Sequence, residues 1–149
     1  MAKPARASRG RSLGVTQIAA NPSRGAERAQ LTLRVDFGPY GALGPGKIKL
    51  LELIERDGSI TAAGKSMDMS YRRAWLLVNS INEMFDEPAV AKQHGGSGGG
   101  NAVLTKFGQK LVAHYRDMER EAQAAVSPRL RALQKSLAAS PPAQAGETD

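Results

Sequence analysis

The sequence predicts a mainly helical domain with one small β-hairpin and a long C-terminal helix. Three observations lead to this fold class. Apolar side chains recur every three or four positions in separate runs, the last of them about five turns long. Ser59, Ser70 and Thr105 each stand where a predicted helix begins, and serine and threonine are favoured at helix N-termini. Two short extended stretches flank a glycine-rich segment, which is typical of a hairpin.

Charge is concentrated at the N-terminus. The 149 residues carry 21 basic and 14 acidic side chains, a net charge of +7 that points to a polyanionic partner. Residues 1–30 hold six basic residues and one acidic residue, and they lack a sustained apolar period. They are predicted to form a disordered basic arm, which either adds phosphate contacts or only solubilises the chain.

Composition excludes several classes of protein. Cysteine is absent and the only imidazoles are His94 and His114, so disulfides, thiol nucleophiles and multi-histidine metal sites are not expected. Apolar runs are too short for a membrane span, so the chain is expected to be cytoplasmic. Residues 41–48 match a phosphate-binding loop except at Ile48, where a magnesium-binding hydroxyl is needed. We therefore expect no enzyme activity, no metal and no cofactor.

The first elements of the domain are a strand and a helix. Apolar and polar residues alternate over residues 31–37, which predicts a strand. A turn rich in glycine and proline follows over residues 38–46. A helix is expected from Lys47, and Gly58 should end it because glycine adopts the left-handed conformation.

Two helices joined by a short turn form the centre of the prediction. The first runs from the Ser59 cap to about Ser66 and contains small residues, which let another helix approach closely. After a turn at residues 67–69, Ser70 caps a longer helix that ends near Phe85. This layout is typical of a helix-turn-helix.

The longer helix divides into two faces at 100° per residue. The face predicted to be buried carries Ala74, Trp75, Val78, Ile81 and Phe85, with Tyr71 beside them. The opposite face carries Arg72, Arg73, Leu76, Asn79, Ser80 and Glu83. Arginine pairs well with guanine and leucine with a thymine methyl group, so this face is interpreted as a recognition surface for the major groove.

A hairpin of residues 89–93 and 102–105 is expected next, with its tip at residues 94–101. Such a hairpin is the wing of a winged helix-turn-helix, and glycine backbone at its tip can approach a phosphate closely. The candidate DNA-binding residues are Ser59, Thr61, Ser70, Tyr71, Arg72, Arg73, Leu76, Asn79, Gly95, Gly96, Ser97, Gly98, Gly99 and Gly100.

The apolar stripe of the final helix is longer than one small domain needs, so its distal part is interpreted as a dimer contact; the alternative is a helix that packs only on its own domain. The candidate interface residues are Phe107, Leu111, Tyr115, Met118 and Ala122. Pro128 is expected to end or kink this helix. Residues 127–149 are then predicted to form a short amphipathic segment with Leu130, Leu133 and Leu137, followed by a disordered tail.

Residues 31–126 resemble the N-terminal winged-helix domain of ModE-type molybdate-responsive regulators and, more distantly, the LysR-type DNA-binding domain. The matching pieces, in the family's order, are residues 58–61, residues 69–75 with 81–84, and residues 95–105. The resemblance implies a homodimer that binds a roughly palindromic operator in double-stranded DNA. Family members continue into molybdate-binding β-barrels; only 23 residues follow Val126 here, so no molybdate site is expected.

The predicted function is therefore a dimeric, sequence-specific DNA-binding transcriptional regulator. Two alternatives stay open: a DNA-organising protein that is independent of sequence, and a winged-helix module that binds another protein. The first alternative relies on the basic arm and the wing, whereas a specific regulator relies on Arg72 and Arg73.

Overall fold

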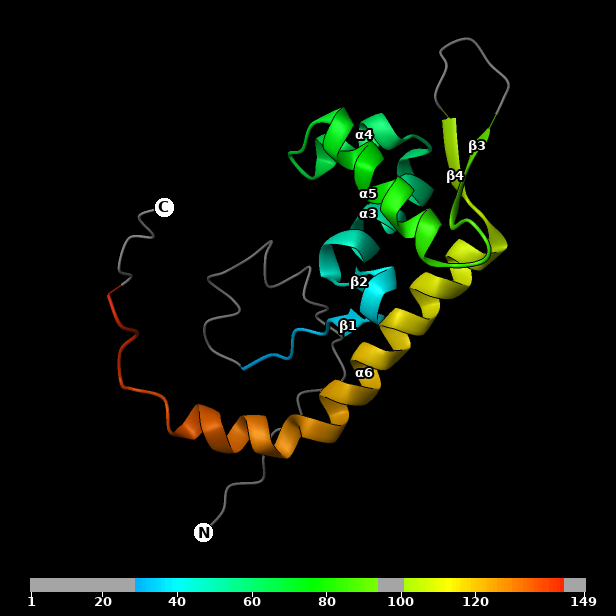
Figure 1. Cartoon of the computed structure of the whole chain (residues 1–149). Helices are drawn as coiled ribbons and strands as arrows, with labels where there is room; N and C mark the ends of the chain where they lie inside the picture. Colours follow the sequence, from blue (N-terminus) through cyan, green and yellow to red (C-terminus); the bar gives the residue numbers. More distant parts are fainter. Residues whose placement is uncertain (1–28, 94–100, 144–149) are drawn as a thin grey trace.

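The computed structural model describes residues 29–93 and 101–143 of the chain. Helices α3 (Pro45–Asp57), α4 (Ile60–Ser66) and α5 (Tyr71–Met84) pack together, and the long helix α6 (Lys106–Lys135) extends away from them (Figure 1). Strands β3 (Val90–Gln93) and β4 (Asn101–Leu104) form an antiparallel hairpin between α5 and α6. The mainly helical class with a small hairpin and a long C-terminal helix is confirmed.

The predicted strand over residues 31–37 is much shorter than expected. Only β1 (Val35–Asp36) pairs, with β2 (Ala42–Leu43), and the one-turn helix η1 (Gly38–Tyr40) connects them. The alternation seen in the sequence is nevertheless real, because burial alternates along residues 31–36. These residues are extended against other parts of the chain, and no neighbouring strand is long enough to pair with all of them.

Helix α3 lies at the centre of the core. Five of its apolar residues are at most 4% exposed: Ile48, Leu50, Leu51, Leu53 and Ile54. Pro45 begins the helix, where its missing N–H costs nothing. Gly58 ends it with a left-handed φ of 75°, and its N–H donates to the Ile54 carbonyl at 2.8 Å. The predicted end of this helix is confirmed.

Ala89 is held between α5 and α6. Its N–H and that of Val90 both donate to Asn82 Oδ1 on α5, at 2.9 and 3.0 Å, and Asn82 Nδ2 donates to the Val90 carbonyl at 3.1 Å. The Ala89 carbonyl accepts the N–H of Thr105, the N-cap of α6, at 2.9 Å. The base of the hairpin is therefore bonded to both helices.

Gly108 in the first turn of α6 allows this contact. A Cβ atom at position 108 would lie 2.1 Å from the Ala89 carbonyl oxygen, a distance that no side chain can occupy. Phe107 packs against Phe85 at the end of α5, with ring centroids 5.1 Å apart, and Phe85 also meets Phe37 at 5.6 Å. The backbone of the hairpin thus lies directly on α6.

Polar contacts continue the attachment of α6 to the core. Arg116 donates to both carboxylate oxygens of Glu52 on α3, at 2.5 and 3.1 Å, and to Glu119 at 2.6 Å. Burial lowers the pKa of Arg116, but these carboxylates outweigh it and leave the pKa raised. Tyr115 is fully buried and donates from its hydroxyl to the Leu33 carbonyl at 2.6 Å; burial, with the nearby Glu119 charge, raises its pKa to about 12.

Helix α6 does not end at Pro128 but continues to Lys135. Figure 1 shows its axis changing direction between the yellow and orange parts, so the kinked alternative is the correct one. The extended segment before β1 follows this helix: Ala29 N–H donates to Gln134 Oε1 at 2.9 Å and Leu31 N–H to Gln123 Oε1 at 3.0 Å. Of the predicted disordered arm, residues 1–28 lie outside the described residues.

We expect Gly108→Ala to lower the free energy of unfolding by about 3 kcal/mol or more, because the methyl group forces Ala89 away from α6. Urea unfolding followed by circular dichroism measures this change. Gly46→Ala is the matched control: a Cβ atom there has no neighbour within 4 Å. It should leave stability unchanged or raise it by up to about 1 kcal/mol. Equal effects of the two substitutions would contradict the proposed contact.

Asn82→Ala should cost about 2–3 kcal/mol, because it leaves two buried N–H groups at the base of the hairpin without a partner. Asn79→Ala on the same helix removes only an exposed bond to Glu83 and should change stability by less than about 0.5 kcal/mol. Amide hydrogen exchange at Ala89 and Val90 is the second measurement. Unchanged protection of those amides in Asn82→Ala would show that Asn82 does not hold the hairpin.

Candidate nucleic-acid interface

Helices α4 and α5 approach as closely as their small residues allow. A Cβ atom at Gly64 of α4 would lie 3.0 Å from the Ala74 Cβ of α5. Met69 N–H donates to the Gly64 carbonyl at 3.0 Å, and Asp68 takes a left-handed φ of 59° to make the turn. Ser70 Oγ accepts from the Arg73 N–H at 3.2 Å and caps α5. The two predicted helices, their short turn and their caps are confirmed.

The first turns of α5 present basic and apolar side chains to solvent. Arg72 and Arg73 are exposed, and within the described residues neither side chain has a hydrogen-bonding or ionic partner. Leu76 is 48% exposed although it is apolar. Together with Ser70 and Leu77, these residues line a shallow open hollow on the surface of the helix. This part of the recognition surface predicted from the sequence is therefore available to a partner.

Trp75 of α5 was predicted to be buried, and this was wrong; Tyr71, placed beside the buried face and among the candidate DNA-binding residues, is also exposed. Tyr71 is 55% exposed and Trp75 is 39% exposed, whereas Ala74, Val78 and Ile81 are buried as predicted. The helix packs on α3 through the narrow strip formed by the buried residues. Trp75 lies about 100° around the helix from Ala74, which places it at the edge of that strip.

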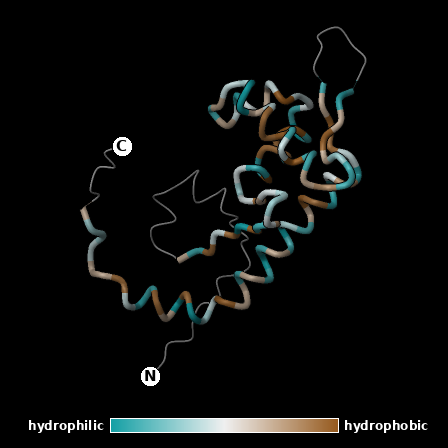
Figure 2. Tube along the Cα trace, in the orientation of Figure 1, coloured by the Kyte–Doolittle hydropathy of each residue, from teal (hydrophilic) through white to brown (hydrophobic). Residues whose placement is uncertain are grey.

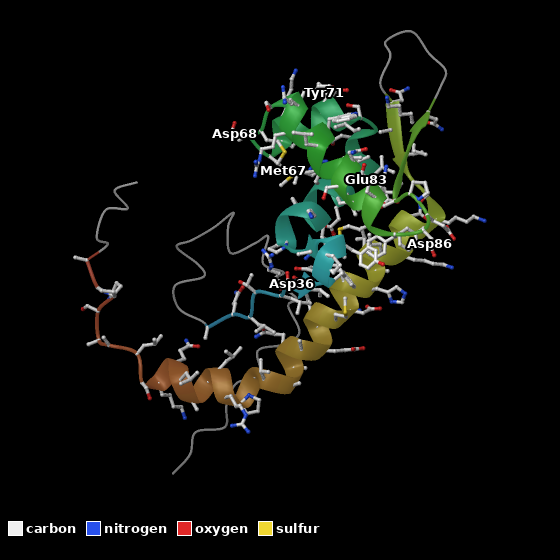
Figure 3. All side chains as sticks on the ribbon, in the orientation of Figure 1. Asp36, Met67, Asp68, Tyr71, Glu83 and Asp86 are labelled. Atoms are coloured by element: carbon white, nitrogen blue, oxygen red, sulfur yellow. The ribbon has the colours of Figure 1, made fainter. Side chains whose placement is uncertain are left out.

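The polar face of α5 is partly used within the chain. Asn79 Nδ2 donates to Glu83 Oε1 at 3.1 Å. Ser80 is half-buried and accepts from Lys47 Nζ at 3.3 Å, and burial, with the charge of Arg34, lowers the pKa of that lysine. Figure 3 shows Tyr71 at the same end of α5 as Asp68, with Glu83 near the other end. The unpartnered residues are therefore concentrated in its N-terminal half.

The N-terminus of α4 lies beside the hairpin. Ser59 Oγ accepts from the Ala62 N–H at 3.0 Å, so its side chain serves as an N-cap, and Thr61 is exposed. Ala102 of β4 donates its N–H to the Gly58 carbonyl at 2.9 Å, and Asn101 pairs with Ser59. The predicted DNA-binding residues Ser59 and Thr61 of α4 thus lie beside the start of β4.

Strands β3 and β4 confirm the predicted hairpin to within one residue at each end. Lys92 and Gln93 are exposed where β3 leads toward the tip. The predicted tip residues Gly95, Gly96, Ser97, Gly98, Gly99 and Gly100 lie outside the described residues.

The predicted dimer stripe divides into two parts. Leu111 is 8% exposed and Tyr115 is fully buried in the core of their own chain, and Phe107 is half-buried against Phe85. Those side chains are occupied by folding. Met118 is 38% exposed, and Ala122 is half-buried in the part of α6 that leaves the core. Sequence periodicity identified the stripe but did not distinguish these two parts.

Among residues 29–93 and 101–143, histidine and acidic side chains form no cluster of three that could hold a metal ion. Within the same ranges, each helix is either too short or too polar to cross a membrane.

Comparison with known proteins gives relatives named ModE and relatives named as molybdenum-pterin-binding proteins. The chain is 42% identical over 98 residues to the molybdenum transport protein ModE of Azotobacter vinelandii. This alignment covers 66% of the chain and 36% of that protein. It is 36% identical over 121 residues to the molybdenum-pterin-binding protein MopB of Rhodobacter capsulatus. That alignment covers 80% of this chain and 43% of MopB. It is 41% identical over 71 residues to the DNA-binding transcriptional dual regulator ModE of Escherichia coli K12. That alignment covers 48% of this chain and 27% of that regulator.

No protein-family model matches the sequence. The chain spans between 27% and 43% of the length of these three relatives, so the similarity concerns only part of each. Within that part, similarity both to ModE proteins and to a molybdenum-pterin-binding protein supports a relationship of this chain to the ModE-type regulators.

Proposed function

We propose that the chain is a DNA-binding transcriptional regulator built as a winged helix-turn-helix. Helix α4, the turn at residues 67–70 and α5 form the helix-turn-helix, and the hairpin β3–β4 is the wing. The observation that carries the proposal is the pair of exposed arginines, Arg72 and Arg73, in the first turn of α5. The proposal is also supported by the similarity to relatives that are named transcriptional regulators.

In this proposal, α5 enters the major groove with its N-terminal end deepest. Arg72 and Arg73 hydrogen-bond guanine edges, and Leu76 contacts a thymine methyl group. Thr61 and the backbone at the start of α4 contact phosphates, because helix N-termini attract anions. Residues 95–100 of the wing contact the DNA backbone.

We further propose that two copies associate through the distal part of α6, beyond the core. Leu133 in the last turn of α6 and Leu137 just after the helix ends are 66% and 64% exposed, and Leu130 on the helix is half-buried. Figure 2 shows hydrophobic positions recurring along this end of the helix, and no other helix of the described residues packs there. A second copy covers such a strip and presents two recognition helices to a palindromic site.

Selection of duplexes from a random pool at near-physiological salt tests the DNA-reading function. We expect the wild-type protein to enrich a palindromic motif, and Arg72→Ala/Arg73→Ala to lose it. The expected loss is about 1–3 kcal/mol of discrimination for each base contact. Lys110→Ala/Arg129→Ala is the matched control, because it removes two exposed positive charges on α6.

The control separates specific contacts from general attraction to phosphate. A regulator that reads sequence keeps its motif in the control variant and loses it in the α5 variant. If both variants bind duplex DNA equally more weakly than the wild type, and the wild type enriches no motif, the chain is instead a DNA organiser. Absence of duplex binding by the wild-type protein would favour a protein-binding module and overturn the proposal.

Sedimentation equilibrium tests the association. We expect the wild-type chain of 15.8 kDa to sediment as a dimer. In Leu133→Glu/Leu137→Glu the dissociation constant should rise at least about 100-fold, because carboxylates without partners enter the interface. Ala113→Glu/His114→Glu adds two acidic residues at exposed positions of the proximal part of α6 and should remain dimeric. A monomeric wild-type chain, or dissociation only in the second variant, contradicts this interface.

A further inference from the structure

We propose that Trp75, together with Tyr71, contacts the DNA duplex directly and forms an apolar contact with one strand on the hairpin side of α5. This inference rests on the proposed DNA-binding function and extends the recognition surface, which already includes Tyr71, Arg72, Arg73 and Leu76, to Trp75. The sequence alone had assigned Trp75 to the core.

The side of α5 on which Trp75 lies follows from helix geometry. Trp75 and Asn82 are seven residues apart, which places them within about 20° of each other around the helix axis. Asn82 is bonded to Ala89 and Val90 at the base of the hairpin, and therefore marks the hairpin side of α5. Tyr71 lies one turn before Trp75 on that same side. Tyr71 and Trp75 thus both lie on the side of α5 that faces the base of the hairpin.

Nothing in the described part of the chain covers these rings completely. Ala74 and Ile81 on the core side of α5 are fully buried, whereas Tyr71 and Trp75 leave 55% and 39% of their area in solvent. Large exposed apolar side chains on α5 occur only in its first two turns, where Leu76 is the third. The C-terminal half of the described helix instead exposes Glu83, with Asn79 and Ser80 half-buried. Apolar area is therefore exposed at the end that enters the groove.

Neighbouring charges favour a nucleic acid as the occupant of this surface. Arg72 and Arg73 directly follow Tyr71 in sequence, and Lys65 is exposed in the last turn of α4. These three cations outnumber Asp68, the acidic residue of the connecting turn, which Figure 3 shows close to Tyr71. A DNA strand carries phosphates, which the cations attract. It also carries the apolar faces of deoxyribose and thymine methyl groups, against which the rings can pack.

Trp75 is the only tryptophan in the chain, so its fluorescence reports on this position alone. The experiment titrates the full chain with the duplex obtained by selection, and measures binding separately by the anisotropy of a dye on that duplex. We expect bound duplex to protect Trp75 from quenching by acrylamide. Binding without any change in quenching overturns the contact and leaves the regulator function standing. A duplex that does not bind at all overturns both.

Substitutions supply a readout that is independent of fluorescence. Trp75→Ala should weaken binding roughly 10–100-fold, as loss of an aromatic contact to nucleic acid does, and Trp75→Phe should restore most of it. The salt dependence of binding should stay as in the wild type, because no ionic contact is removed. Tyr40→Ala is the control at another exposed aromatic residue, which is 70% exposed on η1. Wild-type affinity in a folded Trp75→Ala variant, or a shallower salt slope, overturns the proposal.

Discussion

The arrangement of the candidate interface depends on the position of Ala89. Its N–H is bonded to Asn82 of α5, its carbonyl oxygen to the Thr105 N–H, and its backbone lies against Gly108 of α6. Three elements, α5, the hairpin and α6, therefore meet at one residue. Because each bond is directional and buried, the base of the hairpin has a fixed orientation relative to α5. A recognition helix and a wing that contact one duplex together need that fixed relation.

The same junction explains why side chains on α5 divide as they do. Three of its sides are occupied: one by α3, one by the closely approaching α4, and one, near its C-terminal end, by the hairpin through Asn82. Within the described residues, most exposed side chains of α5 lie in its N-terminal half, among them Arg72, Arg73 and Trp75. Packing thus concentrates the groups available to a partner at one end of the helix.

Local signals in the sequence predicted the parts that depend on local physics. The caps at Ser59, Ser70 and Thr105 and the left-handed Gly58 were all identified, because a cap or a glycine acts on its own helix turn. Trp75 was misplaced because helical periodicity gives the direction of a side chain but not the width of the buried strip. Asn82 and Gly108 were missed, since their roles appear only when α5, α6 and the hairpin come together.

Helix α6 illustrates how one continuous apolar stripe can serve two purposes. Near its start, Leu111 and Tyr115 belong to the core, and Arg116 fixes the helix to Glu52 of α3. Farther along the helix, Gln123 and Gln134 accept N–H groups of the extended segment before β1. Substitutions in the first part therefore affect folding, whereas exposed leucines in the second part are free to serve association. This separation lets the two parts be tested independently, because loss of the distal contact leaves the core that positions α5 intact.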